Sequence, residues 1–384
     1  MADSVPAVGP LIAVCANQAW NLVNFRSGLI AALRDAGFRV LAIAPPDPTM
    51  ETRLRAMGCD FAAAPIDAMG LSPWRDLRTL LALRRIIRVQ RPVAWLSWTI
   101  KPNVYGSLAA GMAGVAALPN VSGLGTAFLR KNFLTALVVG LYRIGFARAS
   151  TVFFQNAEDC ELFLAQGIVR SEQARLLPGS GIDAAAWAPH SPARPAPRGF
   201  LMIARIVADK GVREYVAAAR EIKLRWPDAR FRLLGFRDVA NRTAVGAEEL
   251  AAWEAEGTVE LIEPTDDVRP AITAADFIVL PSYREGLSRV LLEAAAMGRP
   301  IVTTDVPGCR DIVTDGANGY LCRPRDSASL ATALTRAATT DDDNWHRMAD
   351  AGRARVIREF SLERVNRLYF SALIDAGILP PTAL

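Results

Sequence analysis

The chain is poor in the side chains that most often hold metals or form cross-links. It has two histidines, and neither has a metal-like neighbourhood: His190 lies in a Pro-rich stretch, and His346 follows an acidic segment. Its five cysteines are scattered without a C-x-x-C pair, which argues against zinc and disulfides and favours a reducing cytoplasm. These cysteines are Cys15, Cys59, Cys160, Cys309 and Cys322.

Long apolar runs are also missing. The apolar stretches are short and broken by charged or turn residues, and none reaches the roughly 20 residues that a transmembrane helix needs. The first ten residues, MADSVPAVGP, have neither the basic nor the apolar region of a signal peptide. A length of 384 residues, 51% of them hydrophobic, suits two domains that each have a core.

The net positive charge of the chain lies in its first half. Residues 1–195 hold 19 Lys+Arg against 12 Asp+Glu, while residues 196–384 hold 25 against 27. The basic half indicates an anionic surface or substrate. We expect no nucleic acid as a partner, because no binding motif appears and aromatic residues are not interleaved with the basic ones.

Short apolar segments alternate with helical ones in both halves, which predicts an α/β protein with two Rossmann-like, doubly wound parallel sheets. The Pro-rich stretch HSPARPAPRG is the clearest boundary. We therefore expect a first domain at 1–189, a linker at 190–199 and a second domain at 200–384. The last helix, around 361–377, is amphipathic and could pack on either domain. The expected strands are LIAVCAN, RVLAIAP, VAWLSW, AALPNV, TVFFQN and ARLLPG, then FLMIA, RFRLLG, VELI, DFIVLP and PIVTTD.

Charged side chains of the second half stand just past two expected strand ends. Arg205 and Lys210 follow the strand FLMIA, and Glu285 follows the apolar run ADFIVL. Such domains bind ligands at the carboxyl ends of parallel strands, and a pair of them binds in the cleft between the two. Gly286 lets the backbone approach a ligand closely, and Ser288 is a candidate N-cap for the next helix.

A helix that begins at Ser288 would direct free backbone N–H groups at an anion. Glu293 lies about one and a half turns further along, where its carboxylate can accept two hydroxyl hydrogen bonds, as a ribose diol offers. Glu285, in the turn, would lie nearer the sugar ring. Each cluster alone has an ordinary explanation, since Glu, Arg and Lys are common on surfaces. Both clusters in order within one α/β half favour a pocket for a sugar diphosphate.

On these residues the chain resembles the retaining glycosyltransferases of family 4, which have the two-domain GT-B fold. The resemblance covers essentially the whole chain and points to the subgroup that extends polyprenyl-diphosphate-linked sugars, with most likeness to N-acetylgalactosaminyltransferases. The segments that carry it are ARIVADKGVREYV, GFRD, the run from ADFIVLPSYREGLS to GCRDIV, and DGANGYL, with NLVNFRSGLI, TIKPNVYG, NVSGLGTAF and PGSGID in the first half.

The resemblance implies a role for each matching position. Arg205 and Lys210 would bind the donor diphosphate, Glu285 the donor hexose and reacting face, and Glu293 the ribose hydroxyls. Gly286, Leu287 and Ser288 would supply backbone amides near the phosphates and sugar. The positions expected to bind the acceptor and its diphosphate are Asn24, Arg26, Lys101, Gly123 and Gly125.

Two segments depart from the family pattern. Many members have a Gly-Gly turn after the first strand, where this chain has NQAWNLVNF. Many have a histidine where this chain has TIKP, so Ile100 or Lys101 takes its place. Lysine can supply a charge there but not a neutral acid–base imidazole.

The implied reaction is metal-independent transfer with retention, from a nucleotide sugar favoured to carry UDP, to a polyprenyl-diphosphate-linked sugar in bacterial surface polysaccharide or glycan synthesis. No metal or other cofactor is expected. The only acidic run at metal spacing, Asp341–Asp343, is expected to start a helix. Two alternatives stay open: a GT-B nucleotide-sugar epimerase or hydrolase, and an inactive nucleotide-sugar-binding subunit.

Two helices of the first half could bind an anionic membrane surface, which would place the protein on the inner face of the plasma membrane. They could equally be ordinary helices with one face in a core. One carries Arg75, Arg78, Arg84, Arg85, Arg88 and Arg91 among Leu and Ile; the other joins Phe128, Phe133, Leu134 and Leu137 to Arg130 and Lys131.

Overall fold

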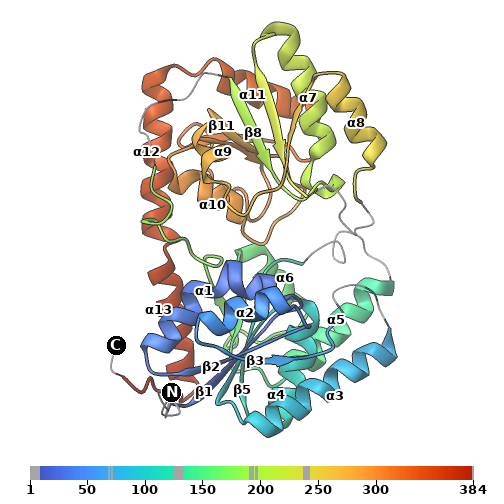
Figure 1. Cartoon of the computed structure of the whole chain (residues 1–384), viewed down its shortest axis with the longest axis vertical. Coiled ribbons are helices and arrows are strands. Elements are labelled where there is room, and N and C mark those ends of the chain that lie inside the picture. Colours follow the sequence, from blue (N-terminus) through green and yellow to red (C-terminus); the bar gives the residue numbers. More distant parts are fainter. Residues whose placement is uncertain are drawn as a thin grey trace. The chain divides into compact units, whose positions relative to one another are not determined.

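The computed structural model describes residues 9–67, 70, 72–124, 133–189, 194, 198–236 and 243–382. The chain forms two compact units, Met1–Ser180 with Leu362–Leu384 (unit 1) and Gly181–Ser361 (unit 2) (Figure 1). Each unit is built on a parallel sheet, which confirms the expected pair of doubly wound α/β domains.

Unit 1 holds a seven-stranded sheet in the order β3-β2-β1-β4-β5-β6-β7. Its strands pair in parallel, and consecutive strands are connected mostly through helices, as the alternating sequence pattern predicts. The strands are β1 (Leu11–Cys15), β2 (Arg39–Ala44), β3 (Asp60–Ala63), β4 (Ala94–Trp98), β5 (Ala116–Val121), β6 (Val152–Phe154) and β7 (Ala174–Leu176).

Alternate residues of β1 enter two separate cores, because successive side chains of a strand point to opposite faces. Ile12 and Val14 pack with α1 (Ala19–Asp35), α2 (Pro48–Ala56) and α13 (Leu362–Asp375). Leu11, Ala13 and Cys15 pack against the helices of the other face. Those are α3 (Pro73–Gln90), α4 (Ser107–Met112), α5 (Phe133–Phe146) and α6 (Ala157–Ala165), with a five-residue π-helix, η1 (Pro102–Gly106), directly before α4.

The last helix, whose place the sequence left open, belongs to unit 1. α13 packs beside α1, with Leu362 against Gly28 and with Val365, Tyr369 and Leu373 buried in the same core (Figure 1). Gly28 has no side chain, and a Cβ there would lie 2.4 Å from a methyl carbon of Leu362. The close helix approach therefore depends on this glycine.

Unit 2 holds a six-stranded parallel sheet in the order β10-β9-β8-β11-β12-β13. Its strands are β8 (Gly199–Ile203), β9 (Arg230–Leu234), β10 (Glu260–Ile262), β11 (Phe277–Leu280), β12 (Ile301–Thr304) and β13 (Gly319–Cys322). Its helices are η3 (Ala208–Lys210, 3₁₀), α7 (Val212–Arg225), α8 (Ala247–Ala255), α9 (Arg269–Thr273), α10 (Arg289–Ala296), α11 (Ser327–Ala338) and α12 (Asp342–Glu359).

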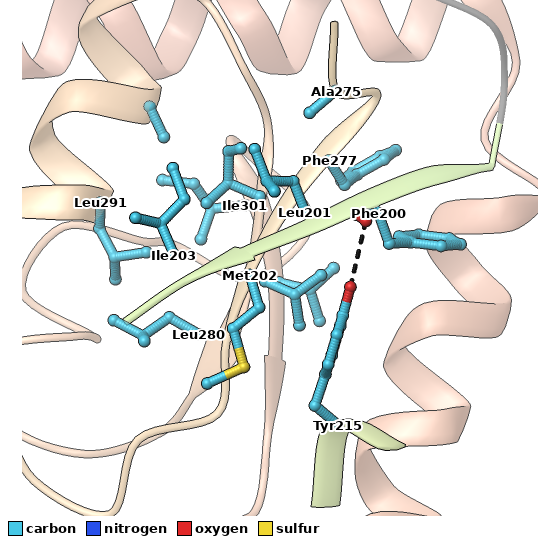
Figure 2. Close-up of a cluster of buried hydrophobic side chains, with 14 of the residues drawn as sticks. Phe200, Leu201, Met202, Ile203, Tyr215, Ala275, Phe277, Leu280, Leu291 and Ile301 are labelled. Atoms are coloured by element: carbon cyan, nitrogen blue, oxygen red, sulfur yellow. Dashed lines mark hydrogen bonds between the residues drawn. The ribbon is translucent and has the colours of Figure 1, made fainter. Parts of the chain in front are cut away.

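β8 lies at the centre of the unit 2 core. Figure 2 shows Leu201 and Ile203 on one side of this strand and Met202 on the other. The buried hydroxyl of Tyr215, on α7, donates to the carbonyl oxygen of Phe200 at 3.1 Å, which satisfies a polar group that would be costly to bury alone. Buried side chains therefore pack on both faces of the strand that leads to Arg205.

The chain enters and leaves unit 2 at adjacent points, where Ile182 forms a parallel β-bridge with Ser361. Arg194, in the segment expected to be a linker, is held in unit 2 by two hydrogen bonds to the buried carboxylate of Asp276, at 2.9 and 3.1 Å. Asp341 caps α12 by accepting from the amide of Asn344 at 2.8 Å, which confirms the expected helix start.

Candidate active site

The two charged stretches of unit 2 meet at the carboxyl edge of its sheet. Lys210 follows β8 and Glu285 follows β11, and these strands are neighbours in the sheet. The ammonium of Lys210 lies 2.5 Å from Oε1 of Glu285, and the two side chains are 20% and 13% exposed. The sequence assigned the lysine to a diphosphate and the glutamate to a sugar, and the structure places them in one ion pair.

Two glycines allow the loops of this pair to approach. Gly211 has φ 75°, and a Cβ there would lie 2.1 Å from the carbonyl oxygen of Pro281. Gly308 has the same φ, and its Cβ would lie 2.6 Å from the carbonyl oxygen of Gly286. A side chain at either position would push the Lys210 or Glu285 loop away, so both glycines are required by close packing and by the left-handed backbone.

Further contacts fix the Glu285 loop against the Lys210 loop. The amide of Tyr283 donates to the carbonyl of Asp209 at 2.9 Å, and the Tyr283 hydroxyl donates to Oε1 of Glu214 at 2.6 Å. Burial, and then the hydrogen bond to Glu214, raise the pKa of Tyr283, so this hydroxyl stays a donor. The sequence alone did not point to Tyr283 or Glu214.

Arg205 differs from Lys210 in having no partner. Its side chain is exposed, two residues beyond the end of β8, and makes no hydrogen bond or ion pair among the described residues. A guanidinium offers five donors in a planar fork that matches phosphate oxygens. Arg205 is therefore ready to bind an anion without first giving up a contact.

The turn after Glu285 leads into α10 as expected, with Ser288 at the N-cap position. The Ser288 side chain makes no capping hydrogen bond, and its amide donates to the carbonyl of Gly308 at 3.1 Å. The expected role of this amide as a free phosphate donor is therefore wrong for this conformation, because the neighbouring Gly308 loop already occupies it. Gly286 is buried, and Leu287 is partly buried against the unit 2 core.

Glu293 lies on α10 and is 9% exposed. Its Oε1 accepts from Nε of Arg289 at 2.8 Å, and Arg289 also donates to the carbonyl of Gly181 at 2.8 Å. Burial raises the pKa of Glu293, and the charge of Arg289 opposes this rise. The Arg289 side chain was missed from the sequence, although its i,i+4 spacing to Glu293 was a visible signal.

In unit 1, neutral side chains form a hydrogen-bonded network at the carboxyl edge of the sheet. The hydroxyl of Ser97 donates to Oδ1 of Asn103 at 2.9 Å, and Nδ2 of Asn103 donates to the carbonyl of Asn120 at 2.7 Å. The Tyr369 hydroxyl, from α13, accepts from Nδ2 of Asn120 at 2.9 Å and from the indole of Trp98 at 3.2 Å. This network of buried groups ties three parts of the chain to one point.

The expected acceptor residues of unit 1 do not form one cluster in the structure. Arg26 is 4% exposed, with its guanidinium 4.5 Å from the ring centroid of Trp98. Lys101 pairs with Asp76 of α3 at 2.7 Å, on the opposite face of the sheet. The amide of Asn24 donates to the Trp20 carbonyl one helical turn back, at 2.9 Å. Gly123 has φ 129°, and Gly125 lies outside the described residues.

The segment that departs from the family pattern is strained. Thr99, directly after β4, has φ 71°, a left-handed conformation that a β-branched residue rarely adopts. Its hydroxyl oxygen accepts from the amide of Asn17 at 3.2 Å, which links the loops after β4 and β1. The π-helix η1 follows within three residues. Backbone strain and single π-turns are both concentrated at functional sites.

One open groove of unit 1 lies away from these residues. It has a volume of about 560 Å³ and is formed mainly by α13, with Ala32 of α1. None of the expected site residues lines it. Across the described ranges no helix is long and apolar enough to span a bilayer. The same ranges hold no group of three or more His, Cys, Asp or Glu side chains placed to bind a metal.

Comparison with known proteins gives a consistent result for both halves. Residues 197–340 match the family described as Glycosyl transferases group 1, and residues 24–180 match the Glycosyl transferase 4-like domain. A similar curated protein is the N,N′-diacetylbacillosaminyl-diphospho-undecaprenol alpha-1,3-N-acetylgalactosaminyltransferase of Campylobacter jejuni. It is 26% identical over 332 residues, which cover 82% of this chain and 86% of the relative. Glycogen synthase of Mycobacterium tuberculosis is 32% identical over 188 residues, 48% of this chain and 45% of that protein.

Solved structures agree on the fold. Anabaena HepE, crystallised in complex with UDP, superposes with a TM-score of 0.76 at 17% identity, over 95% of this chain and 99% of that one. Sucrose-phosphate synthase of Thermosynechococcus elongatus gives 0.74 at 17% identity, with the same coverage. These likenesses confirm a GT-B arrangement of two Rossmann-like domains.

Proposed function

Since the chain belongs to the GT-B glycosyltransferases, with a glycosyl transferase 4-like domain followed by a group 1 domain, we propose that it builds bacterial surface polysaccharide or glycan. The proposed reaction moves a hexose or N-acetylhexosamine from a nucleotide sugar, UDP-linked, to a sugar carried on polyprenyl diphosphate. The enzyme then works at the inner face of the plasma membrane, where such an acceptor is embedded.

The observation that carries this proposal is the likeness to the Campylobacter enzyme, because it extends over most of both chains. That relative is named for a diphospho-undecaprenol-linked acceptor. The colanic acid glycosyltransferase of Salmonella typhimurium, 27% identical over 202 residues, supports a place in polysaccharide synthesis. HepE was also solved with UDP-glucose, which favours UDP as the nucleotide.

The charges of unit 2 suit a nucleoside diphosphate leaving group. Negative charge develops on the diphosphate as the glycosidic bond breaks, and preorganised cations lower the barrier. Arg205 is exposed and unpaired among the described residues, and Lys210 can share its ammonium between Glu285 and a phosphate oxygen. With two cations in this place, we propose that the transfer needs no metal or other cofactor.

Glu285 is the proposed contact to the donor hexose. Its carboxylate is only 13% exposed and is held by Lys210, so it is oriented before a donor arrives. Glu293 would hold the ribose hydroxyls, with Arg289 fixing its position. We propose retention of the anomeric configuration, on the family resemblance, and NMR of the product's anomeric proton tests this directly.

The alternative functions make different demands on the protein. An epimerase or hydrolase needs catalytic acids beyond the donor pocket, yet the network described at the edge of unit 1 is built on amides such as Asn103 and Asn120. An inactive binding subunit would not need Arg205, Lys210, Glu285 and Glu293 together.

Incubation of the purified protein with UDP-sugars, with and without a polyprenyl-diphosphate sugar, separates the three functions. Transfer requires the acceptor, epimerisation or hydrolysis proceeds without it, and a binding subunit gives only a shift in thermal stability by mass action. Turnover of a UDP-sugar without any acceptor would overturn the proposal.

Metal independence is tested in the same assay with excess EDTA. We expect turnover to persist, because Arg205 and Lys210 occupy the place of a cation. An abrupt loss that Mg²⁺ restores would contradict this. The active pair of donor sugar and acceptor is first identified with metal present. The EDTA test then does not depend on the question of substrate identity.

A further inference from the structure

The outer surface of α3 combines exposed apolar side chains with unpaired arginines. Trp74 is 81% exposed, Leu77 45%, Leu81 53% and Val89 69%. Four large apolar side chains exposed along one helix are unusual. Such an exposed apolar patch marks an interaction surface. With three exposed arginines they form what we call the α3 face: Trp74, Leu77, Arg78, Leu81, Arg85, Arg88 and Val89.

These residues lie on one side of the helix. At 100° per residue they fall within about a third of the helix circumference. The opposite side is fixed in the core of unit 1, where Thr79, Leu83 and Ile87 are buried. The helix of 18 residues is about 27 Å long, so the α3 face is a strip with Trp74 near one end and Arg88 near the other.

The electrostatics of this face have one sign. Residues 77–157 contain ten Lys or Arg and no Asp or Glu. Asp76, the one acid of α3, is buried and paired with Lys101, and Asp67 pairs with Arg75 at 3.1 Å. Arg78, Arg85 and Arg88 make no ion pair within the part of the chain that the structure describes. A surface of this composition is complementary to an anionic one.

Neighbouring helices of the same layer add apolar side chains. α4 packs between α3 and α5, and Met112 at its end is 50% exposed. On α5, Leu137 is 44% and Ile144 59% exposed. Phe128, Arg130 and Lys131, which the sequence also suggested for membrane binding, lie outside the described residues.

We propose that the α3 face docks this protein on a bilayer that contains anionic phospholipid. Tryptophan prefers the interface between headgroups and acyl chains, and arginine binds lipid phosphates. Leu77 and Leu81 would enter the acyl boundary while Arg78, Arg85 and Arg88 stay at headgroup level. This docking site deepens the proposed function. Only the choice of a membrane as the partner, rather than an acidic protein or RNA, rests on that function.

The test is flotation of the full chain with vesicles of pure phosphatidylcholine and of phosphatidylcholine with 30% phosphatidylglycerol. The wild type should float with the anionic vesicles and bind the neutral ones weakly. The variant Arg78→Gln, Arg85→Gln and Arg88→Gln should bind anionic vesicles roughly 100-fold more weakly, since each basic residue near the surface contributes about fivefold. Trp74→Ala should weaken binding to both vesicles by roughly tenfold.

A matched control removes the same charge from unit 2. Arg213→Gln, Arg220→Gln and Arg230→Gln change exposed arginines that pair with Glu249, Glu256 and Glu260, and this variant should float like the wild type. An equal loss in the control, or no flotation of the wild type, overturns the proposal. Tight RNA binding without flotation would assign the face to nucleic acid instead.

Failure of docking and failure of the proposed reaction are distinguishable. Transfer to a short-chain, water-soluble diphosphate-sugar acceptor needs no vesicle, so the α3 triple variant should retain it. If the wild type transfers sugar to no acceptor, the proposed reaction is overturned. The flotation experiment still tests the docking proposal in that case.

Discussion

The two sheets of this protein end in chemically different edges. At the carboxyl edge of the unit 2 sheet, charged groups stand in pairs, Lys210 with Glu285 and Arg289 with Glu293. At the same edge of unit 1, the hydrogen-bonded groups centred on Asn120 are neutral amides and hydroxyls, with Arg26 as a buried charge over the ring of Trp98. The difference teaches that one architecture can carry two kinds of edge: ion pairs between loops in unit 2, and a network of neutral hydrogen bonds in unit 1.

The way each edge is assembled follows from its chemistry. An ion pair between two loops needs their backbones close together, and Gly211 and Gly308 provide that approach. A neutral network needs each buried donor to find an acceptor, and Tyr369 supplies one from the far end of the chain. The charged edge is therefore local to unit 2, and the neutral edge depends on α13.

The largest effect should come from removing a cation of the charged edge. Lys210→Ala and Arg205→Ala should each lower kcat by roughly 10²–10³, the usual cost of one preorganised charge-stabilising group. Steady-state kinetics at saturating donor measure this. Lys223→Ala is the control, because Lys223 is a partly exposed lysine on α7 that donates to the carbonyl of Gly257.

Thermal unfolding of Arg205→Ala should match the wild type within about 1 kcal/mol, because its exposed side chain makes no ion pair among the described residues. Lys210→Ala should fold but lose roughly 1–3 kcal/mol, because it leaves the 13% exposed carboxylate of Glu285 without its partner. Full activity in the folded Lys210→Ala or Arg205→Ala protein would remove the diphosphate assignment. Loss of activity together with unfolding would instead make Lys210 a structural residue.

Substitutions of the two glutamates of the charged edge should change different kinetic constants. Glu285→Gln should mainly lower kcat, because we propose that Glu285 contacts the sugar whose charge changes. Glu293→Gln should mainly raise the donor KM, by about tenfold or more for a hydrogen bond to a charged group. Donor-saturation curves at fixed acceptor measure both, and the reverse pattern would show that the donor lies the other way round.

A substitution at the neutral edge should lower the stability of the protein more than it changes ligand binding. Asn120→Ala leaves the Tyr369 hydroxyl without one of its donors and should lower the free energy of unfolding by about 1–3 kcal/mol. Affinity for UDP, which we propose to bind to unit 2, should stay unchanged. Urea denaturation measures the free energy of unfolding, and UDP titration measures the affinity. A fall in UDP affinity in Asn120→Ala would show that the two edges do not act separately.

The sequence predicted the charged edge far better than the neutral one. Arg205, Lys210 and Glu285 follow apolar strands at short range, so the rule that ligands bind past strand ends locates them. The Lys210–Glu285 ion pair did not follow from that rule, since it depends on β8 and β11 being neighbours. Arg289 was visible as an i,i+4 partner of Glu293, but a helical spacing does not show which face is buried.

The neutral network was outside the reach of sequence patterns. Asn120 and Tyr369 are 249 residues apart, and no periodicity predicts that they meet. The sequence left the place of α13 open, because an amphipathic pattern shows that one face is buried but not which domain buries it. Arg26 and Lys101 were expected near one ligand, yet they lie on opposite faces of the sheet, because one turns to Trp98 and the other to Asp76.

The smallest expected effect concerns the charge of Glu293. Burial raises the pKa of this carboxyl above its ordinary 4.5, so it takes up a proton at a higher pH than an exposed glutamate does. Ribose hydroxyls donate best to the charged form, so donor binding should favour the carboxylate and release protons. UDP affinity should therefore fall by a few-fold as the pH drops toward 5. The UDP phosphate also titrates in this range, with a pKa of about 6 for a phosphate monoester, so Glu293→Gln serves as the reference. Calorimetric titration of both proteins from pH 7 to 5 should give a steeper loss of affinity in the wild type than in Glu293→Gln, and equal slopes would show that Glu293 does not contact the donor.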